Sequence, residues 1–181
     1  DFSRIESGTE YPQEGPRWMY NSSSVARCEK ALNPLRVCSN AAVDFIGFPY
    51  RHVAVSRNMQ SLRMWQDIAN YIGLDYYVMG RLDNHPDKSG YGRVKRAFHY
   101  LAEHEDAYKN MQGNGDVLLV RLPRYDISPE ACGWIRAITE SHILLEETNP
   151  DSIVSAEDIA RFKAVILPDL RTIPGKLAKI L

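Results

Sequence analysis

The alternation of hydrophobic and polar positions is most regular in residues 56–80, where it predicts an amphipathic helix followed by a buried strand. Apolar residues recur at spacings of three and four, which places them on one helical face, while Arg63 and Asp67 fall mostly elsewhere. Gly73 stands where the helix is expected to end, and residues 74–79 form an apolar, aromatic-rich run typical of a strand covered on both faces. The predicted apolar face consists of Leu62, Trp65, Ile68, Ala69 and Ile72.

The remainder of residues 1–111 shows the same order of strands and helices. Residues 1–7 alternate loosely and resemble the tail of a strand, and residues 35–45 are strand-like. Two further helices are expected, one over residues 22–32 and a longer one marked by apolar positions from 94 to 108. Because the chain opens on a strand tail and closes on the first turns of a helix, we expect it to be a piece of a longer protein.

A second domain is expected from residue 112 onward, because Gln112-Gly113-Asn114-Gly115 interrupts every regular pattern. Beyond it, strands and helices alternate at the spacing of a parallel α/β sheet. The glycines precede a strand, so they are interpreted as linker residues rather than a phosphate-binding loop. We predict strands at residues 116–122, 143–145 and 164–167, with helices that begin at Ser128 and at Ser155.

The composition and charge of the chain argue against several classes of function. The chain has 181 residues, a formal net charge of −1, 44% hydrophobic residues and three cysteines. The near-neutral charge gives no indication of nucleic-acid or anionic-membrane binding, and no apolar run approaches the roughly 20 residues that span a bilayer. The odd number of cysteines, without a C-x-x-C pair, fits buried free thiols in a reducing compartment, so we expect a cytoplasmic protein.

Two patterns that suggest a cofactor or a nucleophile are rejected on spacing. His99 and His104 are five residues apart, about 140° around a helix, so they do not form the zinc pair of an H-x-x-E-H helix. Cys132 lies inside a predicted helix with no neighbouring base in the sequence, which argues against a catalytic thiol. We therefore expect no metal and no cofactor.

Acidic residues near the predicted strand ends are the candidates for chemistry. The carboxyl ends of parallel strands are where α/β enzymes gather functional side chains, and glycoside hydrolysis needs two carboxyl groups flanking the bond. Taken singly, each acid fits a salt-bridge or loop-capping role as well, and each nearby aromatic fits core packing as well as stacking on a sugar. The acids are Glu6, Glu10, Asp44, Asp83 and Asp87, and the aromatics are Trp18, Tyr20, Tyr50 and Tyr91.

Four segments, taken in order, resemble certain bacterial glycoside hydrolases with a (β/α)8 catalytic barrel, similar to beta-galactosidases that carry a trimerisation domain. The segments are PRWMYNSSSVAR, VDFIGFPYRHVAVS, MWQDIANYIGLDYYVMGRLDNHPD and VKRAFHYLAEHE. The second half, from DVLLVRL to AVILPDL, resembles the trimerisation domain, whose fold is flavodoxin-like and glutamine-amidotransferase-like. The series of motifs is fairly specific, although each motif alone is weak.

The resemblance implies an α/β protein in two incomplete parts. Residues 1–111 correspond to the last three strand–helix units of a TIM barrel, and residues 112–181 to the start of a Rossmann-like trimerisation domain. The family's nucleophile is a glutamate at the end of strand seven, but residues 36–45 offer only Asn40 and Asp44 there. Either Asp44 substitutes, or Glu6 or Glu10 from the preceding strand reaches in, or hydrolysis has been lost.

The functional expectation is a fragment of a glycoside hydrolase that acts on carbohydrate and forms a homotrimer at full length. Glu6, Glu10 or Asp44 supplies the carboxylate, and a rim of polar and aromatic side chains holds the sugar. The alternatives are an inactive barrel that binds carbohydrate or serves assembly, and a small amidotransferase- or flavodoxin-like domain with its own chemistry. The expected sugar-binding residues are Arg51, Asp83, His85, Trp18 and Tyr20.

Overall fold

A computed structural model describes residues 2–7, 19–122, 127–168 and 170–181, which form two compact units. The first unit comprises residues 1–26 and 35–112, and the second comprises residues 27–34 and 113–181. The division falls within the predicted breaker, but the short segment 27–34 groups with the second unit. In the described part of the chain, no helix is both long and apolar enough to cross a membrane.

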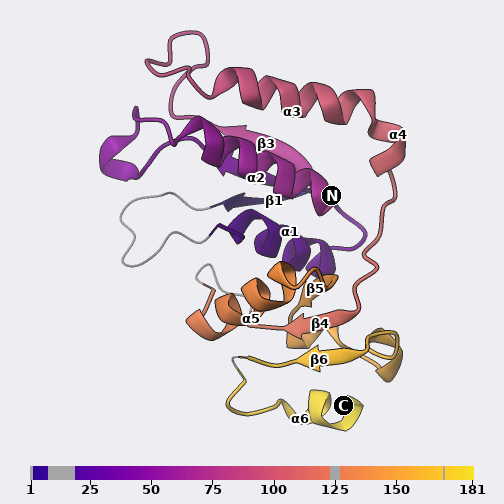
Figure 1. Ribbon diagram of the computed structural model, residues 1–181. Coiled ribbons are helices and arrows are strands. Elements are labelled where there is room, and N and C mark those ends of the chain that lie inside the picture. The colour runs from indigo at the N-terminus through magenta and orange to yellow at the C-terminus, as the bar shows by residue number, and fades with distance from the viewer. Residues whose placement is uncertain (1, 8–18, 123–126, 169) are drawn as a thin grey trace. The chain divides into compact units, whose positions relative to one another are not determined.

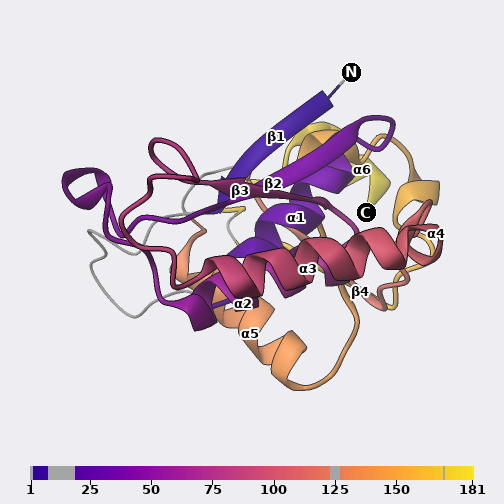
Figure 2. The same cartoon turned by 90° about the horizontal axis from the view of Figure 1, so that it is seen from above.

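The first unit is built on a parallel sheet in the order β1-β2-β3, with β1 at Phe2–Ser7, β2 at Val37–Val43 and β3 at Gly73–Tyr77. Its helices are α1 (Asn21–Leu32, the last part of which groups with the second unit), α2 (Arg57–Ala69), α3 (Tyr91–Glu103) and α4 (Glu105–Tyr108), with a 3-10 turn at Phe48–Tyr50. Figure 2 shows α2 and α3 on the same side of the sheet. The barrel resemblance implies that residues 35–45 and 74–79 are neighbouring parallel strands, and this pairing is confirmed.

The long helix predicted up to Tyr108 is interrupted. It ends at Glu103, and His104 caps it before the short α4. Within the described residues the three strands do not close into a barrel, so the fold they establish is an open parallel α/β sheet.

The prediction of which α2 residues are buried is largely wrong. Of its members, Ile68 and Ile72 are buried, whereas Trp65 is 36% exposed and Ala69 lies at the surface. The buried side instead carries Gln60, Arg63, Met64 and Asp67. The reason is polar partners in β2: Gln60 donates to the Ala42 carbonyl at 3.2 Å and Arg63 to the Val43 carbonyl at 2.9 Å.

A buried polar network joins β1, β2, α1 and α2. The Asn40 amide donates to Ser7 Oγ at 2.6 Å and to Asp67 Oδ1 at 2.7 Å, and Ser7 Oγ lies 2.6 Å from Ser22 Oγ. Burial raises the pKa of Asp67 well above its usual value, against the lowering effects of the Asn40 hydrogen bond and the charge of Arg63. Folding therefore shifts the protonation equilibrium of Asp67 toward its neutral form.

Asp67→Asn is expected to remove a pH dependence of stability. A folded-state pKa above the unfolded value means that stability falls as pH rises beyond about 3.8, since the folded state then retains a proton that the unfolded chain releases. Asparagine carries no charge at any pH, so the stability of the variant relative to wild type should be higher at pH 8 than at pH 5. Urea unfolding at pH 5 and pH 8 measures this. Asp116→Asn, at an exposed acid, is the control, and an equal pH slope in wild type and Asp67→Asn would contradict the expectation.

The second unit has a parallel sheet in the order β5-β4-β6, visible in Figure 1, with β4 at Val117–Val120, β5 at Leu145–Thr148 and β6 at Ala164–Ile166. Its helices are α5 (Pro129–Glu140) and α6 (Gly175–Ile180), with 3-10 turns at Pro150–Ser152 and Ala156–Asp158. Ser128 caps α5 as predicted, because its hydroxyl accepts from the Ala131 amide at 3.1 Å.

Two predictions for the second unit need correction. The strand expected at residues 143–145 begins only at Leu145, since Ile143 and Leu144 are 43% and 58% exposed. Ser155 and Asp158 do form a capping box, but it opens a single 3-10 turn rather than an α-helix. Only residues 159–163 separate that turn from β6, too few for a crossover helix.

The predicted linker glycines pack tightly. A Cβ added at Gly113 would collide with the Glu146 carboxylate, and one at Gly115 would lie 2.9 Å from Glu146 Cγ. The Gly115 amide donates to Glu146 Oε1 at 2.7 Å. These glycines therefore also let the chain approach Glu146 closely, which spacing alone did not indicate.

His142→Gly is expected to stabilise the second unit by about 1 kcal/mol. His142 follows α5 with φ of 57°, a left-handed conformation that glycine adopts without a Cβ penalty, and the Ile143 amide closes the helix end on the Ile138 carbonyl. Thermal unfolding measures the gain, with His142→Ala as the control that keeps the Cβ. A glycine variant no more stable than the alanine variant would contradict the prediction.

Candidate functional site

The carboxyl half of the first sheet carries polar side chains on both faces. Register aligns Glu6 with Ala41 and Asp75, whereas Ser7 aligns with Ala42 and Tyr76. Side chains alternate between the faces of a strand, and Ala42 and Tyr76 pack against the helices. Glu6 and Asp75 therefore lie on the other face, which we call the open face and define by Arg4, Glu6, Asp75 and Tyr77.

Arg4 organises the open face. Its Nη1 donates to Glu6 Oε1 at 3.0 Å, its Nε donates to Asp75 Oδ2, and its Cζ lies 5.4 Å from the centroid of the Tyr77 ring. The side chains of Arg4 and Glu6 are 38% and 48% exposed. The hydrogen bond to Asp75 is the main reason that the pKa of Arg4 is raised. Glu6 is thus an accessible carboxylate beside a fixed cation.

Asp44 follows β2 and is completely buried on the helix side. The Tyr76 hydroxyl donates to Asp44 Oδ2, and a Cβ at Gly90 would lie 4.0 Å from the same oxygen. Burial raises the pKa of Asp44, against the lowering effects of Tyr76, the Val55 amide and His85. Burial and the hydrogen bond to Asp44 raise the pKa of Tyr76. These contacts suit an anchoring role at the end of β2.

His85 lies close to Asp44 and links the two loops that follow β2 and β3. Its ring is 3% exposed, and its Nδ1 lies 2.8 Å from the Asp87 carbonyl, so Nδ1 carries the hydrogen. Its ring centroid is 6.3 Å from those of His52 and Tyr91. Within the described residues, His85 Nε2, Tyr91 Oη and Asp44 Oδ1 have no hydrogen-bond partner. The loop end is held further by Asp87, whose pKa is lowered by hydrogen bonds from Ser89.

The remaining predicted site residues are dispersed. Arg51 and Asp83 are exposed, with Asp83 Oδ2 2.9 Å from the Arg81 guanidinium, and Tyr20 is half-buried. Glu10 and Trp18 lie outside the described residues. The structure brings Asp44 and His85 together, but it separates both from Glu6, which lies on the opposite face of the sheet.

Sequence reasoning missed Arg4, Asp75 and Tyr76. The run LDYYVM predicts a strand covered on both faces. Burying the charge of Asp75 in such a strand is costly unless a group of opposite charge pairs with it. That charge was the signal that a cation from elsewhere in the sheet faces β3. Its source in β1 depends on the register, which the sequence does not state.

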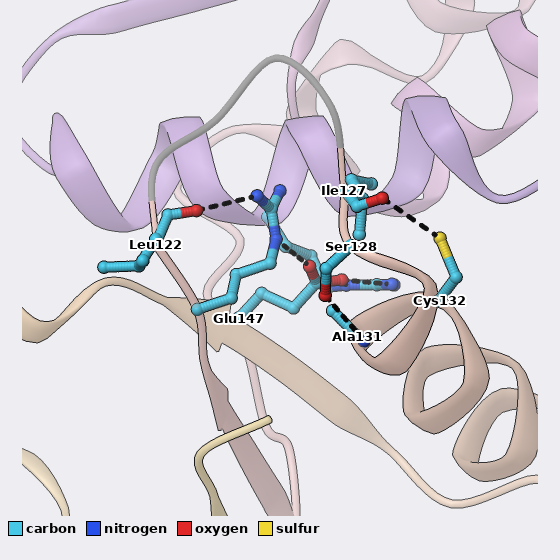
Figure 3. Close-up of polar contacts among 8 residues, drawn as sticks. Leu122, Ile127, Ser128, Ala131, Cys132 and Glu147 are labelled. Atoms are coloured by element: carbon cyan, nitrogen blue, oxygen red, sulfur yellow. Dashed lines mark hydrogen bonds and ion pairs between the residues drawn. The ribbon is translucent and has the colours of Figure 1, made fainter. Parts of the chain in front are cut away.

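The second unit holds a buried ion network around Glu147, shown in Figure 3 beside the N-terminus of α5. Arg121 Nε lies 3.0 Å from Glu147 Oε2, and Arg27 Nη2 lies 2.7 Å from Glu147 Oε1. The Glu147 side chain is wholly buried and that of Arg121 is 3% exposed. Burial, assisted by the charge of Glu147, raises the pKa of the Cys28 thiol to about 12, so this cysteine is an inert thiol.

Comparison with known proteins gives a structural match. No family model matches the chain, and no curated protein matches it significantly. Among solved structures, it is similar to alpha-L-fucosidase isoenzyme 2 from Paenibacillus thiaminolyticus, with a TM-score of 0.67 and 18% identity. The chain has the fold of part of a glycoside hydrolase. The match covers 98% of this chain but 27% of the fucosidase, so the chain spans about a quarter of that protein's length.

The match extends over both units, because it includes nearly the whole chain. At this identity it establishes the shared fold and leaves activity to be argued from the residues. It gives no support to a beta-galactosidase trimerisation domain in particular, since the matched protein is a fucosidase. The homotrimer and the identity of the second unit remain predictions.

Proposed function

We propose that the protein is a glycoside hydrolase to which this chain contributes the last three strand–helix units of a (β/α)8 barrel and the start of a flavodoxin-like domain. Support comes from three consecutive parallel strands that pair in sequence order, with helices between them along one face. Adjacent units of such a barrel have this arrangement, and the opposite face of the strands lines the barrel interior. The fold shared with a fucosidase agrees with it.

The observation that carries the proposal is Glu6 on the open face, one residue before the carboxyl end of β1. Active sites of these barrels form at the carboxyl ends of the strands, and hydrolysis requires accessible carboxyl groups there. Glu6 meets this requirement, whereas Asp44 is buried on the helix side. In this proposal Glu6 contacts the substrate, Asp44 anchors the loops of the rim, and Glu10 stays a candidate second carboxylate.

The loops that follow β2 and β3 form the rim of the proposed site and supply side chains that can contact the sugar. Arg51 and Asp83 are exposed beyond the carboxyl ends of β2 and β3, where hydroxyl groups of a sugar can accept from the guanidinium and donate to the carboxylate. His85, buried next to Asp44, holds this rim rather than the sugar. Trp18 and Tyr20 stay candidates for stacking on the sugar ring. We also propose a homotrimer for the full-length protein, measurable by light scattering.

The test is hydrolysis of a panel of aryl glycosides, including α-L-fucosides and β-galactosides, by the full-length protein. Turnover of at least one glycoside is expected. A non-catalytic carbohydrate-binding protein is the second candidate, favoured by the ion pair that already occupies Glu6. Glycan binding without any turnover would replace the first proposal with the second. If the protein neither binds nor hydrolyses a glycan, both proposals are contradicted.

A further inference from the structure

The open face places one long side chain across the sheet. Arg4, two residues before Glu6, pairs with Ser39 of β2, and Ser39 pairs with Gly73 of β3. Across these three strands the side chains therefore fall in size from arginine to serine to none. A Cβ at Gly73 would lie 3.0 Å from the Cys38 carbonyl oxygen and 3.5 Å from Ser39 Cβ. Gly73 therefore lies too close to β2 to carry a side chain. Because Ser39 is small and Gly73 has no side chain, Arg4 can extend across β2 and reach a residue of β3.

Arg4 therefore bridges two carboxylates that come from different strands. Glu6 and Asp75 occupy one register row with Ala41 between them, two strand spacings or roughly 10 Å apart at Cα. The planar guanidinium offers donors in several fixed directions, so one edge serves Asp75 through Nε and another serves Glu6 through Nη1 at 3.0 Å. Lysine lacks this fork and cannot reproduce it.

We propose that Asp75 and Arg4 are positioning residues that hold the Glu6 carboxylate in a fixed orientation on the open face. Asp75 fixes the direction of the guanidinium, and the guanidinium fixes Glu6. The inference rests on the proposed glycosidase function and deepens it, because it gives Glu6 the anionic role of nucleophile or general base. The role of general acid then belongs to another carboxyl group.

The other groups around Glu6 support this assignment. From β3 it is faced by two titratable groups, Asp75 and Tyr77. From β2 it is faced by Ala41, Ser39 and Val43, and these three side chains carry no charge. Among the described residues of the sheet, Arg4 is the cation on this face. Ser39 is 5% exposed and its Oγ has no hydrogen-bond partner in the described structure, which adds a polar atom at the level of Arg4.

The test is steady-state hydrolysis by the full-length protein in wild type, Arg4→Met and Arg4→Lys. Because Arg4 orients Glu6 in this proposal and does not itself bind the substrate, Arg4→Met should lower kcat about tenfold with KM unchanged. Arg4→Lys should not restore kcat, since lysine lacks the planar fork of donors. Arg136→Met, which removes an exposed arginine paired with Glu140, is the matched control and should change neither kcat nor KM.

A second variant tests Asp75. Asp75→Asn keeps the shape of the side chain but releases Arg4, so we expect kcat to fall about tenfold with KM unchanged. An unchanged kcat in Asp75→Asn would overturn the role of Asp75, and an unchanged kcat in Arg4→Met would overturn the role of Arg4. Absence of turnover in wild type would instead overturn the proposed function, whereas equal turnover in wild type and both variants would overturn this inference alone.

Discussion

Replacing Glu147 with glutamine is expected to destabilise the second unit by about 3–5 kcal/mol. The carboxylate is wholly buried and neutralises Arg121 and Arg27, whose guanidinium nitrogens lie 3.0 Å and 2.7 Å from it. Glutamine keeps the volume but leaves two cations near each other in a buried setting without their counter-charge. Breaking such a group by removal of one member costs much more than the intact group contributes.

Urea unfolding followed by circular dichroism measures this loss in Glu147→Gln. Glu140→Gln is the matched control, because Glu140 makes an exposed pair with Arg136 at 2.9 Å and its loss should cost less than about 0.5 kcal/mol. Equal unfolding midpoints for the two variants would show that the buried network contributes no more than a surface pair. A double variant, Glu147→Leu with Arg121→Met, should recover part of the stability.

Glu6→Gln is expected to lower kcat by about 10³-fold or more on the aryl glycoside that wild type hydrolyses best. An amide of the same shape can neither act as a nucleophile nor accept a proton as a carboxylate does, and removal of such a group has effects of this size in other enzymes. The exposure of Glu6 on the open face means that the variant should fold normally. Its thermal unfolding midpoint should match that of wild type.

Comparison of Asp44→Asn with Glu6→Gln distinguishes the roles of the two carboxyl groups. Asp44 is buried among the helices and bonded to Tyr76, so its replacement should alter stability while kcat changes less than about tenfold. The control is Glu157→Gln, at an exposed acid of the second unit, which should change neither the stability nor kcat. Full loss of turnover in a folded Asp44→Asn protein, with activity retained in Glu6→Gln, would reverse the assignment of the two carboxylates.

Elements whose signals are local were predicted well. The predicted N-cap of α5, Ser128, accepts a hydrogen bond from the Ala131 amide three residues along. Such a cap depends on a few adjacent residues, so the sequence contains the full information. The parallel pairing of β2 with β3 followed from the resemblance to a (β/α)8 barrel, in which successive strands lie side by side.

Predictions failed where a distant partner decides burial. Trp65 is exposed and Asp67 is buried, because Asn40 of β2 supplies the hydrogen bond that makes the buried acid acceptable. Hydrophobic periodicity assigns faces by side-chain polarity alone, and it has no access to a partner 27 residues away. The same applies to the Arg63 side chain, which donates to the Val43 carbonyl.

The sequence by itself determined the alternation of strands and helices, the cap of α5, and the presence of acids at the ends of β1 and β2. Only the tertiary structure decided that Glu6 and Asp44 point to opposite faces and that Asp75 belongs with Glu6. The physical reason is register: side chains alternate with a period of two, so a shift of one residue between paired strands exchanges the faces. Hydrogen bonds between strands that lie more than 25 residues apart in the chain fix that register, and no local pattern encodes it.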